Sequence, residues 1–381
     1  MSTKAFFHVD FRPLLIFALS FLIDLGLSSI NFGVPLYAYK LGAPQYLIGL
    51  IASAFGLSYI FSAVYSVKIA FGRNLANTIT ILLLSYTGIA AIYIIVRNPF
   101  LFIVIRAFEG FILGNLYPLT DTLPAASGSG KNLVPWYNAG WAFSYIVAPL
   151  VLGYLITLLG FSSPFTFAAL ATLSALVLIR MSAGRLRLNT MQNTSKRVLS
   201  LGRNTLSEIA FPAFIAGFIT AVFSSLYPAY LASRRFGYES IGLVMGTMAA
   251  SRTIVLAASG RIQAAIGLGK LKAIGYALSV LIAIPTVLHG LTEQFICALS
   301  VGAGVGLLYH VGLSNSLSKA GEYQTSELEA SLGTGFFSGP LLGAAISDIS
   351  PNYVYMGVSI IPLIPLISLK RNTNTKPNQV S

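Results

Sequence analysis

The residues most able to do chemistry in this sequence are a few charged side chains inside long apolar runs. They are Asp24 in the first run, Arg106 and Glu109 in the fourth, and Arg252 in the eighth. An ionised group at the middle of a bilayer costs at least about 2.5–3.5 kcal/mol, so each needs a partner, a watery cavity or a proton. At about 1.5 Å per residue, Asp24, Glu109 and Arg252 lie roughly 15–18 Å below the outer end of their runs, and Arg106 about 10 Å. We therefore expect a common central layer of charge.

Proton transfer is the chemistry that such a layer could carry. Burial favours the protonated form of a carboxyl group and a nearby arginine favours the ionised form, so a carboxyl can bind and release a proton as its surroundings change. One face of the first run carries polar residues at helical spacing: Ser20, Asp24, Ser28 and Asn31. The alternative is a static ion pair, because Arg106 and Glu109 are three residues apart and could simply neutralise each other. Asp24 has no such neighbour in the sequence.

A second group of residues is able to contact a substrate. We name Asn31, Asn115, Tyr117, Trp141, Tyr227, Arg252 and His310. Arg252 suits an anionic substrate, and His310 either binds and titrates or is a neutral buried histidine. The aromatic rings could stack on a sugar or a planar molecule, or serve only in packing.

Composition excludes most other classes of protein. The chain has 381 residues, of which 55% are hydrophobic and 9% charged, whereas soluble domains carry about 25% charged residues. The net charge of +13 does not indicate a nucleic-acid partner, because the basic residues are scattered at the ends of apolar runs. The segment Gly128-Ser129-Gly130-Lys131-Asn132 lacks the glycine and Ser/Thr positions of a phosphate-binding loop. We expect no enzyme activity, no cofactor and no metal. We also expect no disulfide within the chain, since Cys297 is its one cysteine.

Apolar runs long enough to span a bilayer recur along the chain. The first six lie near residues 13–36, 46–67, 75–96, 99–120, 135–158 and 164–181, and the second six near 209–231, 239–259, 271–289, 293–314, 328–347 and 352–369. A span needs about 20 apolar residues. The pattern predicts an all-α membrane protein with twelve transmembrane helices.

The basic residues predict its orientation. With the N-terminus in the cytoplasm, the segments predicted to lie outside hold only Lys40, Arg97, Arg234 and Arg235. The other Lys and Arg residues of the loops and tails then fall on the cytoplasmic side. Lys and Arg collect on the cytoplasmic side of membrane proteins. We therefore predict a multi-pass protein of the cytoplasmic (cell) membrane with both termini in the cytoplasm.

The two sets of six runs look like copies of each other. Pro35-Leu36-Tyr37 matches Pro228-Ala229-Tyr230, and Ile48-Gly49-Leu50 matches Ile241-Gly242-Leu243, both at an offset of 193. Leu116-Tyr117 matches Leu308-Tyr309, and Ala148-Pro149-Leu150 matches Gly339-Pro340-Leu341, at 192 and 191. We predict two pseudo-symmetric six-helix bundles at 1–181 and 209–369, a cytoplasmic linker at 182–208 and a tail at 370–381. Parallel repeats of this kind bind substrate between them.

Three motifs resemble those of the major facilitator superfamily, and the resemblance covers nearly the whole chain. Between the second and third runs stands Gly72-Arg73, with Ile69 at the usual acidic place, and the second copy holds Gly260-Arg261 and Gly267. The fourth run contains Arg106-Ala107-Phe108-Glu109-Gly110, which is similar to an Arg-x-x-Gln/Glu-Gly motif of this family. The eleventh contains Gly335 to Gly343 around Pro340, similar to a glycine-proline packing motif. The resemblance implies that Gly72, Arg73, Gly260, Arg261 and Gly267 belong to a gate. It also implies an alternative for Arg252, because members of this family often have an arginine at this place near the inner gate.

The resemblance also implies a function. Several proton-coupled symporters of this family use an Asp in the first span with a Glu and an Arg in the fourth, which match Asp24, Glu109 and Arg106. We expect a secondary transporter that moves a small organic solute by alternating access, coupled to protons as a symporter, and working as a monomer in the bilayer. The alternative is proton-driven efflux of drugs or metabolites, and a membrane receptor or enzyme is the third reading.

Overall fold

The computed structural model describes residues 10–70, 74–126, 130–182, 210–318 and 322–374. Within these residues the regular structure is helical throughout. The first part of the chain forms α1 (Arg12–Lys40), α2 (Gln45–Ala70), α3 (Leu75–Ile95), α4 (Leu101–Thr120), α5 (Leu123–Ala126), α6 (Gly130–Leu159) and α7 (Ser163–Ser182). The second part forms α8 (Phe211–Ser225), α9 (Tyr227–Ser233), α10 (Tyr238–Ile266), α11 (Leu268–Val280), α12 (Ile284–Val287), α13 (Leu291–Ser318), α14 (Glu322–Ile349) and α15 (Val354–Asn374), with 3-10 turns at Leu281–Ala283 and Pro351–Tyr353.

The expected all-α membrane architecture is confirmed in its coarse form. Ten helical segments among the described residues are long and apolar enough to cross a membrane. The eleventh and twelfth predicted runs form α14 and α15, but these helices fall outside that set, and the apolar part of α15 is the short segment Val354–Ile367. The count of twelve spans therefore stays a prediction.

Two predicted spans are interrupted at prolines. The seventh is divided at Leu226 into α8 and α9, with Pro228 in the first turn of α9. The ninth ends in a 3-10 turn and the short α12, which begins around Pro285. Proline has no backbone N–H to donate and clashes with the preceding turn, so a helix tends to restart at it. Hydropathy alone did not reveal either interruption.

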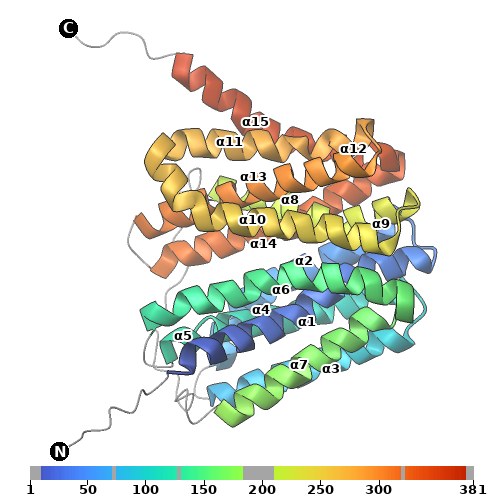
Figure 1. Cartoon of the computed structure of the whole chain (residues 1–381), viewed down its shortest axis with the longest axis vertical. Coiled ribbons are helices and arrows are strands. Elements are labelled where there is room, and N and C mark those ends of the chain that lie inside the picture. The colour runs from blue at the N-terminus through green and yellow to red at the C-terminus, as the bar shows by residue number, and fades with distance from the viewer. Residues whose placement is uncertain (1–9, 71–73, 127–129, 183–209, 319–321, 375–381) are drawn as a thin grey trace, which may run out of the picture.

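The helices form two groups that lie side by side in Figure 1, with α1 to α7 in the lower part of the view and the helices from α8 onward in the upper part. The start of α1 and the end of α15 lie at the same end of the molecule. α7 ends at Ser182 and α8 begins at Phe211, so the predicted linker falls almost wholly outside the described residues. The predicted bundle boundaries remain predictions.

Helix pairing within the two groups follows the repeat found in the sequence. α4 packs on α2 with Gly110 against the carbonyl oxygen of Phe55, and α13 packs on α10 with Gly302 against that of Met248. A Cβ at either glycine would overlap the opposing backbone. These contacts join positions related by the offset of 192–193, so the same helix packing occurs in both groups.

The two groups meet through a symmetric pair of contacts. Gly49 of α2 lies against the carbonyl oxygen of Pro340 in α14, and Gly242 of α10 lies against that of Pro149 in α6. A Cβ built on Gly49 would stand 2.6 Å from the Pro340 oxygen, closer than real Cβ atoms come. Gly49 and Gly242 are repeat partners, as are Pro149 and Pro340. Both contacts lie near the end of the molecule opposite the start of α1, because they involve the first turns of α2 and α10.

Candidate functional site

Asp24 is a buried carboxyl group without a cation beside it. It lies in the middle of α1 with 3% of its surface exposed. Its Oδ1 accepts a hydrogen bond of 2.7 Å from the hydroxyl of Tyr117 on α4. The ion pairs of the described residues are Arg12–Asp10 and Arg106–Glu109, and neither involves Asp24. The structure thus brings together the predicted proton-coupling residue Asp24 and the predicted substrate-binding residue Tyr117.

Glu109 has a very different environment. Its side chain is fully buried, and its Oε2 accepts a bond of 2.8 Å from Nη1 of Arg106. Two tyrosines of α3 complete the shell, with Tyr86 donating to Oε1 at 3.1 Å and Tyr93 to Oε2 at 3.3 Å. A buried carboxylate with a bonded cation and two hydroxyl donors has its charge satisfied. Glu109 and Arg106 are therefore partners in the structure, which matches the static ion pair considered from the sequence.

Arg106 also reaches across to α1. Its Nη2 donates a hydrogen bond of 2.8 Å to Oδ1 of Asn31, and its guanidinium carbon lies 4.5 Å from the ring centre of Phe55. The Nε atom is buried without a hydrogen-bond partner. A cavity of about 20 Å³ lies here, lined by Asn31 and Arg106 and by Ser224 and Ser225 of α8, and it is large enough for a water-sized group. Arg106 and Asn31 thus stand where the two groups of helices meet.

Arg252 lies near the middle of α10 and faces aromatic rings of α6. Its guanidinium carbon is 5.6 Å from the ring centre of Trp141 and 5.1 Å from that of Tyr145. Its Nε and Nη2 atoms are buried and make no hydrogen bond within the described part of the chain. Cation–π contacts hold at up to about 6 Å. The structure therefore joins the predicted residues Arg252 and Trp141 across the two groups of helices.

Tyr145 of α6 lies close both to the Asp24–Tyr117 pair and to the Arg252–Trp141 pair. Its hydroxyl lies close enough to Asp24, Tyr117 and Arg252 for all three to act on it electrostatically. Asp24, Tyr117, Tyr145 and Arg252 consequently lie near one another in a series that runs from α1 through α4 and α6 to α10. We call these four residues the central path.

Three residues predicted to contact substrate lie elsewhere. Asn115 donates to Ser62 of α2 and to the carbonyl oxygen of Phe111 in its own helix. Tyr227 donates to the side chain of Gln294 on α13, within the second group. His310 pairs with Gln263 at 2.7 Å and lies 3.2 Å from the hydroxyl of Ser314. The structure does not bring these three residues to the central path.

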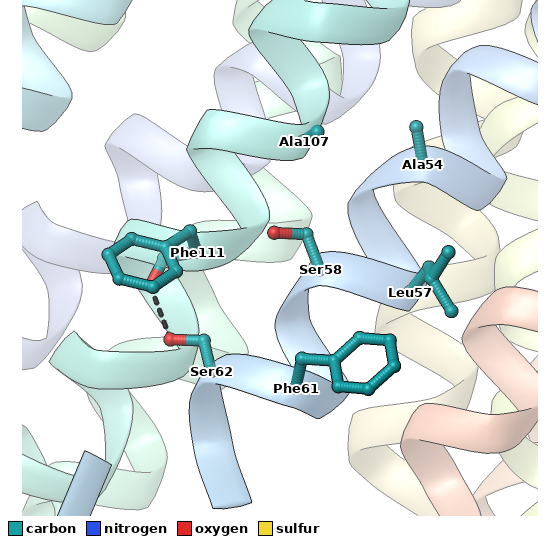
Figure 2. Close-up of a pocket in the computed structure, with 7 residues that line it drawn as sticks. All are labelled: Ala54, Leu57, Ser58, Phe61, Ser62, Ala107 and Phe111. Carbon is teal, nitrogen blue, oxygen red and sulfur yellow. Dashed lines mark hydrogen bonds between the residues drawn. The ribbon is translucent and has the colours of Figure 1, made fainter. Parts of the chain in front are cut away.

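A separate pocket lies at the surface of α2 and α4, with a volume of about 400 Å³. Figure 2 shows its lining: Ala54, Leu57, Ser58, Phe61, Ser62, Ala107 and Phe111. Phe61 and Phe111 are 60% and 48% exposed, so the pocket is open at the surface rather than enclosed. The two serine hydroxyls are its polar side-chain groups, and that of Ser62 donates to the carbonyl oxygen of Phe111 at 2.6 Å.

Comparison with known families decides what kind of protein carries this arrangement. A sequence model described as Major Facilitator Superfamily matches residues 16–326, which is most of the chain. The chain belongs to the Major Facilitator Superfamily. It is therefore a multi-pass membrane transporter of some solute, and the resemblance found from its motifs is confirmed.

Solved structures with the same fold are distant in sequence. The nucleoside transporter NupG superposes with a TM-score of 0.72 at 13% identity, covering 96% of this chain and 100% of its own. A POT family transporter in complex with 5-aminolevulinic acid gives 0.74 at 13%, covering 97% and 98%. A bacterial homologue of the iron transporter ferroportin, in an inward-facing state, gives 0.70 at 14%, covering 94% and 98%. No curated protein sequence matches the chain.

The structure describes only the second copy of the predicted gate motif, because Gly72 and Arg73 lie outside the described residues. Gly260 and Arg261 are exposed on the last two turns of α10. Gly267 joins α10 to α11 with a φ of 81°, a backbone conformation that glycine adopts without strain. Its role in the structure is a sharp turn between two helices.

Several residues of the site escaped the sequence analysis. Tyr86 and Tyr93 bind the Glu109 carboxylate, and Tyr145 lies close to both Asp24 and Arg252. In a membrane sequence a tyrosine is most often an interface residue. Spacing along α3 or α6 gives no sign of a partner on another helix. A signal does exist in hindsight, since buried tyrosines must satisfy their hydroxyl groups.

Proposed function

We propose that this transporter is a proton-coupled symporter that moves a small organic solute across the cytoplasmic membrane by alternating access. The observation that carries the proposal is Asp24, a buried carboxyl group with one hydrogen bond from Tyr117 and no cation. An ionised carboxylate there lacks a counter-charge, so binding a proton is the simplest way to neutralise it. Asp24 is accordingly the proton-carrying residue in this proposal.

Glu109 and Arg106 have a supporting part in it. Glu109 remains the fixed counter-ion of Arg106, because an ion pair and two tyrosine hydroxyls already hold its carboxylate. Arg106 faces the other bundle, since it borders the small cavity with Ser224 and Ser225 of α8. Coupling then arises when protonation of Asp24 and binding of the solute favour the same conformation.

Alternating access is supported by the contacts between the bundles. The Gly49–Pro340 and Gly242–Pro149 contacts close the end opposite the start of α1 and the end of α15. With both termini in the cytoplasm, as the basic residues predict, this closed end is the outer one. The two six-helix bundles at 1–181 and 209–369 rock against each other about the central path, and a single copy of the chain suffices.

The experiment uses purified protein in vesicles that enclose the pH dye pyranine. Uridine, dialanine, 5-aminolevulinate, lactate and glucose are added outside one at a time at equal pH, with protein-free vesicles as the control. We expect at least one solute to acidify the lumen, because its inward movement carries protons. Radiolabelled uptake of that solute must also rise when the outside is made acidic. Uptake that ignores the pH gradient would mean that transport is uncoupled.

A second candidate is proton-driven efflux of amphipathic compounds. It is favoured by the lateral pocket of about 400 Å³, whose apolar lining opens at the surface of α2 and α4 (Figure 2). Such a pocket could receive a compound directly from the bilayer. Replacing Ala54 by Trp would fill it. Efflux predicts that this variant loses resistance to lipophilic cations in cells, whereas the symport proposal predicts unchanged solute uptake.

A further inference from the structure

Arg252 is a cation that no carboxylate of the described residues contacts. It is the fifteenth of the 29 residues of α10, far from either end of the helix. Its Nε and Nη2 atoms are buried without an acceptor, and no ion pair of the described residues includes it. Removing one partner of a buried charge pair leaves the other charge uncompensated at high cost. A buried guanidinium group with unfilled N–H groups and no contacting carboxylate is therefore a place where an anion from outside the chain would be stabilised.

The aromatic residues around Arg252 contact its guanidinium group but give the N–H groups of its edge no hydrogen-bond acceptor. Trp141 and Tyr145 approach within 5.6 and 5.1 Å of the guanidinium carbon through their rings. Rings attract the charge through the face of the π system and do not replace acceptors for its N–H groups. The fork of Nε and Nη2 matches the two oxygens of a carboxylate, which arginine binds with two parallel hydrogen bonds.

We propose that Arg252 binds the carboxylate of a monoanionic organic substrate, and that this anion moves together with one proton carried by Asp24. The inference rests on the proposed proton-coupled transport and names its substrate class. Trp141 and Tyr145 belong to one bundle and Arg252 to the other, so an anion bound here touches both halves. That position is required of a substrate whose binding controls the movement of one half against the other.

The charges of the helix interiors give the stoichiometry. Among the side chains that the structure describes beyond the first turns of the helices, the acidic and arginine residues that are not exposed are Asp24, Arg106, Glu109 and Arg252. The carboxylate of Asp121, which acts on Asp24, is exposed after the end of α4 and is counted with the solvent. Arg106 and Glu109 neutralise each other. The empty site with ionised Asp24 is then neutral, and so is the site that holds both a proton and a monoanion. A proton alone or an anion alone leaves one uncompensated charge, which disfavours the conformational change in those states. Transport of one anion with one proton is therefore electroneutral.

Binding can be measured through Trp141 itself. The chain has two tryptophans, so the substitution Trp136→Phe at an exposed position leaves Trp141 as the sole reporter beside Arg252. The probes are benzoate against benzamide, lactate against lactamide and nicotinate against nicotinamide, which differ in charge at similar size. We expect at least one carboxylate to change the fluorescence, its amide to have no effect at ten times the concentration, and affinity to rise as pH falls from 7.5 to 5.5.

The substitution Arg252→Gln separates binding from folding. Because Arg252 is unpaired, we expect Arg252→Gln to keep or raise the unfolding temperature while carboxylate binding falls at least tenfold, and Arg252→Lys to retain part of the binding. A lower unfolding temperature with unchanged binding would assign Arg252 a structural role and overturn the proposal. Amides that bind as well as the carboxylates, or no carboxylate that binds, would overturn it too.

Transport distinguishes this inference from the proposed function on which it rests. For the carboxylate that binds best, uptake under an acidic outside should change less than twofold when a potassium diffusion potential is imposed with valinomycin. Uptake driven by the potential would overturn electroneutral symport. If an uncharged solute is carried with protons and survives Arg252→Gln, the proposed function stands and the anion inference falls. If no uptake responds to pH, the proposed function fails as well.

Discussion

At the scale of single residues, the two buried carboxyl groups differ in what surrounds them. Glu109 has a cation and two tyrosine hydroxyls, and Asp24 has one tyrosine hydroxyl. The sequence predicted both residues as ionisable groups of one central layer. It could not distinguish their roles, because the partners Tyr86, Tyr93 and Tyr117 come from other helices. The residue types were thus predictable, and the pairing that decides their chemistry was not.

This difference predicts unequal costs of neutralisation. Glu109→Gln leaves Arg106 buried without its counter-ion, which we expect to cost about 3–5 kcal/mol of unfolding free energy. Asp24→Asn keeps an oxygen that accepts from Tyr117, so its cost should stay within about 1 kcal/mol. Unfolding of both variants in one detergent measures this, with Asp348→Asn at an exposed position as the control. A Glu109→Gln variant as stable as that control would show that Glu109 is not the fixed counter-ion.

At the scale of helices, small residues set where the two bundles touch. The sequence contains Gly49 and Gly242 as members of a repeated motif, and the structure places each against the carbonyl oxygen of a proline from the other repeat. The repeat and most helix bounds were predictable from apolar runs and short matches. The contacts of α2 with α14 and of α10 with α6 were not predictable. An offset along the chain does not say which helices face one another. Pro340 belongs to the predicted glycine-proline packing motif and Pro149 is its repeat partner, but the sequence does not predict which helix either one contacts.

A bulky side chain at one of these contacts should hold the closed end open. We expect Gly242→Val to separate α10 from α6 and to move the bundles apart as rigid bodies. Spin labels on the other contact, at Tyr46→Cys and Ile349→Cys in a Cys297→Ser background, report this from a distance, since both labelled positions are exposed. Their separation should grow by several ångströms. The matched control is Gly88→Val, where a Cβ meets nothing within 4 Å.

That experiment has a clear contrary outcome. If Gly242→Val leaves the label separation as it is in the control, then the Gly242–Pro149 contact does not hold the bundles together. A change seen only by labels placed on α6 and α10 themselves would mean a local shift of one helix. Either result would remove the basis for rocking of rigid bundles.

At the scale of the whole molecule, orientation in the membrane links the closed end to a compartment. The start of α1 and the end of α15 lie at one end, and the exposed residues Asn98 and Asn132 lie before α4 and early in α6. The loop before α4 and the start of α6 are on opposite sides of the bundle, because one helix, α4, separates them. Composition predicted the membrane and charge asymmetry predicted the orientation, both without any contact between helices.

Cysteine labelling tests the orientation. In the Cys297→Ser background, a membrane-impermeant maleimide should label Asn98→Cys in intact cells and should label Asn132→Cys only after the cells are opened. The reverse pattern would place the termini outside and make the closed end cytoplasmic. Labelling of both positions in intact cells would contradict an odd number of crossings between them.

The central claim is that Asp24 carries the coupled proton. The most direct test compares two activities of the Asp24→Asn variant: accumulation of solute driven by a proton gradient, and exchange of solute without a gradient. Asn accepts from Tyr117 but carries no proton, so the carrier should still bind solute and exchange it. With a transported solute in vesicles, we predict that Asp24→Asn keeps counterflow exchange within about threefold of the parent, since the bond to Tyr117 remains. Accumulation driven by an inward proton gradient should disappear. Accumulation that persists in Asp24→Asn would contradict the account, because Asp24 would then not carry the coupled proton.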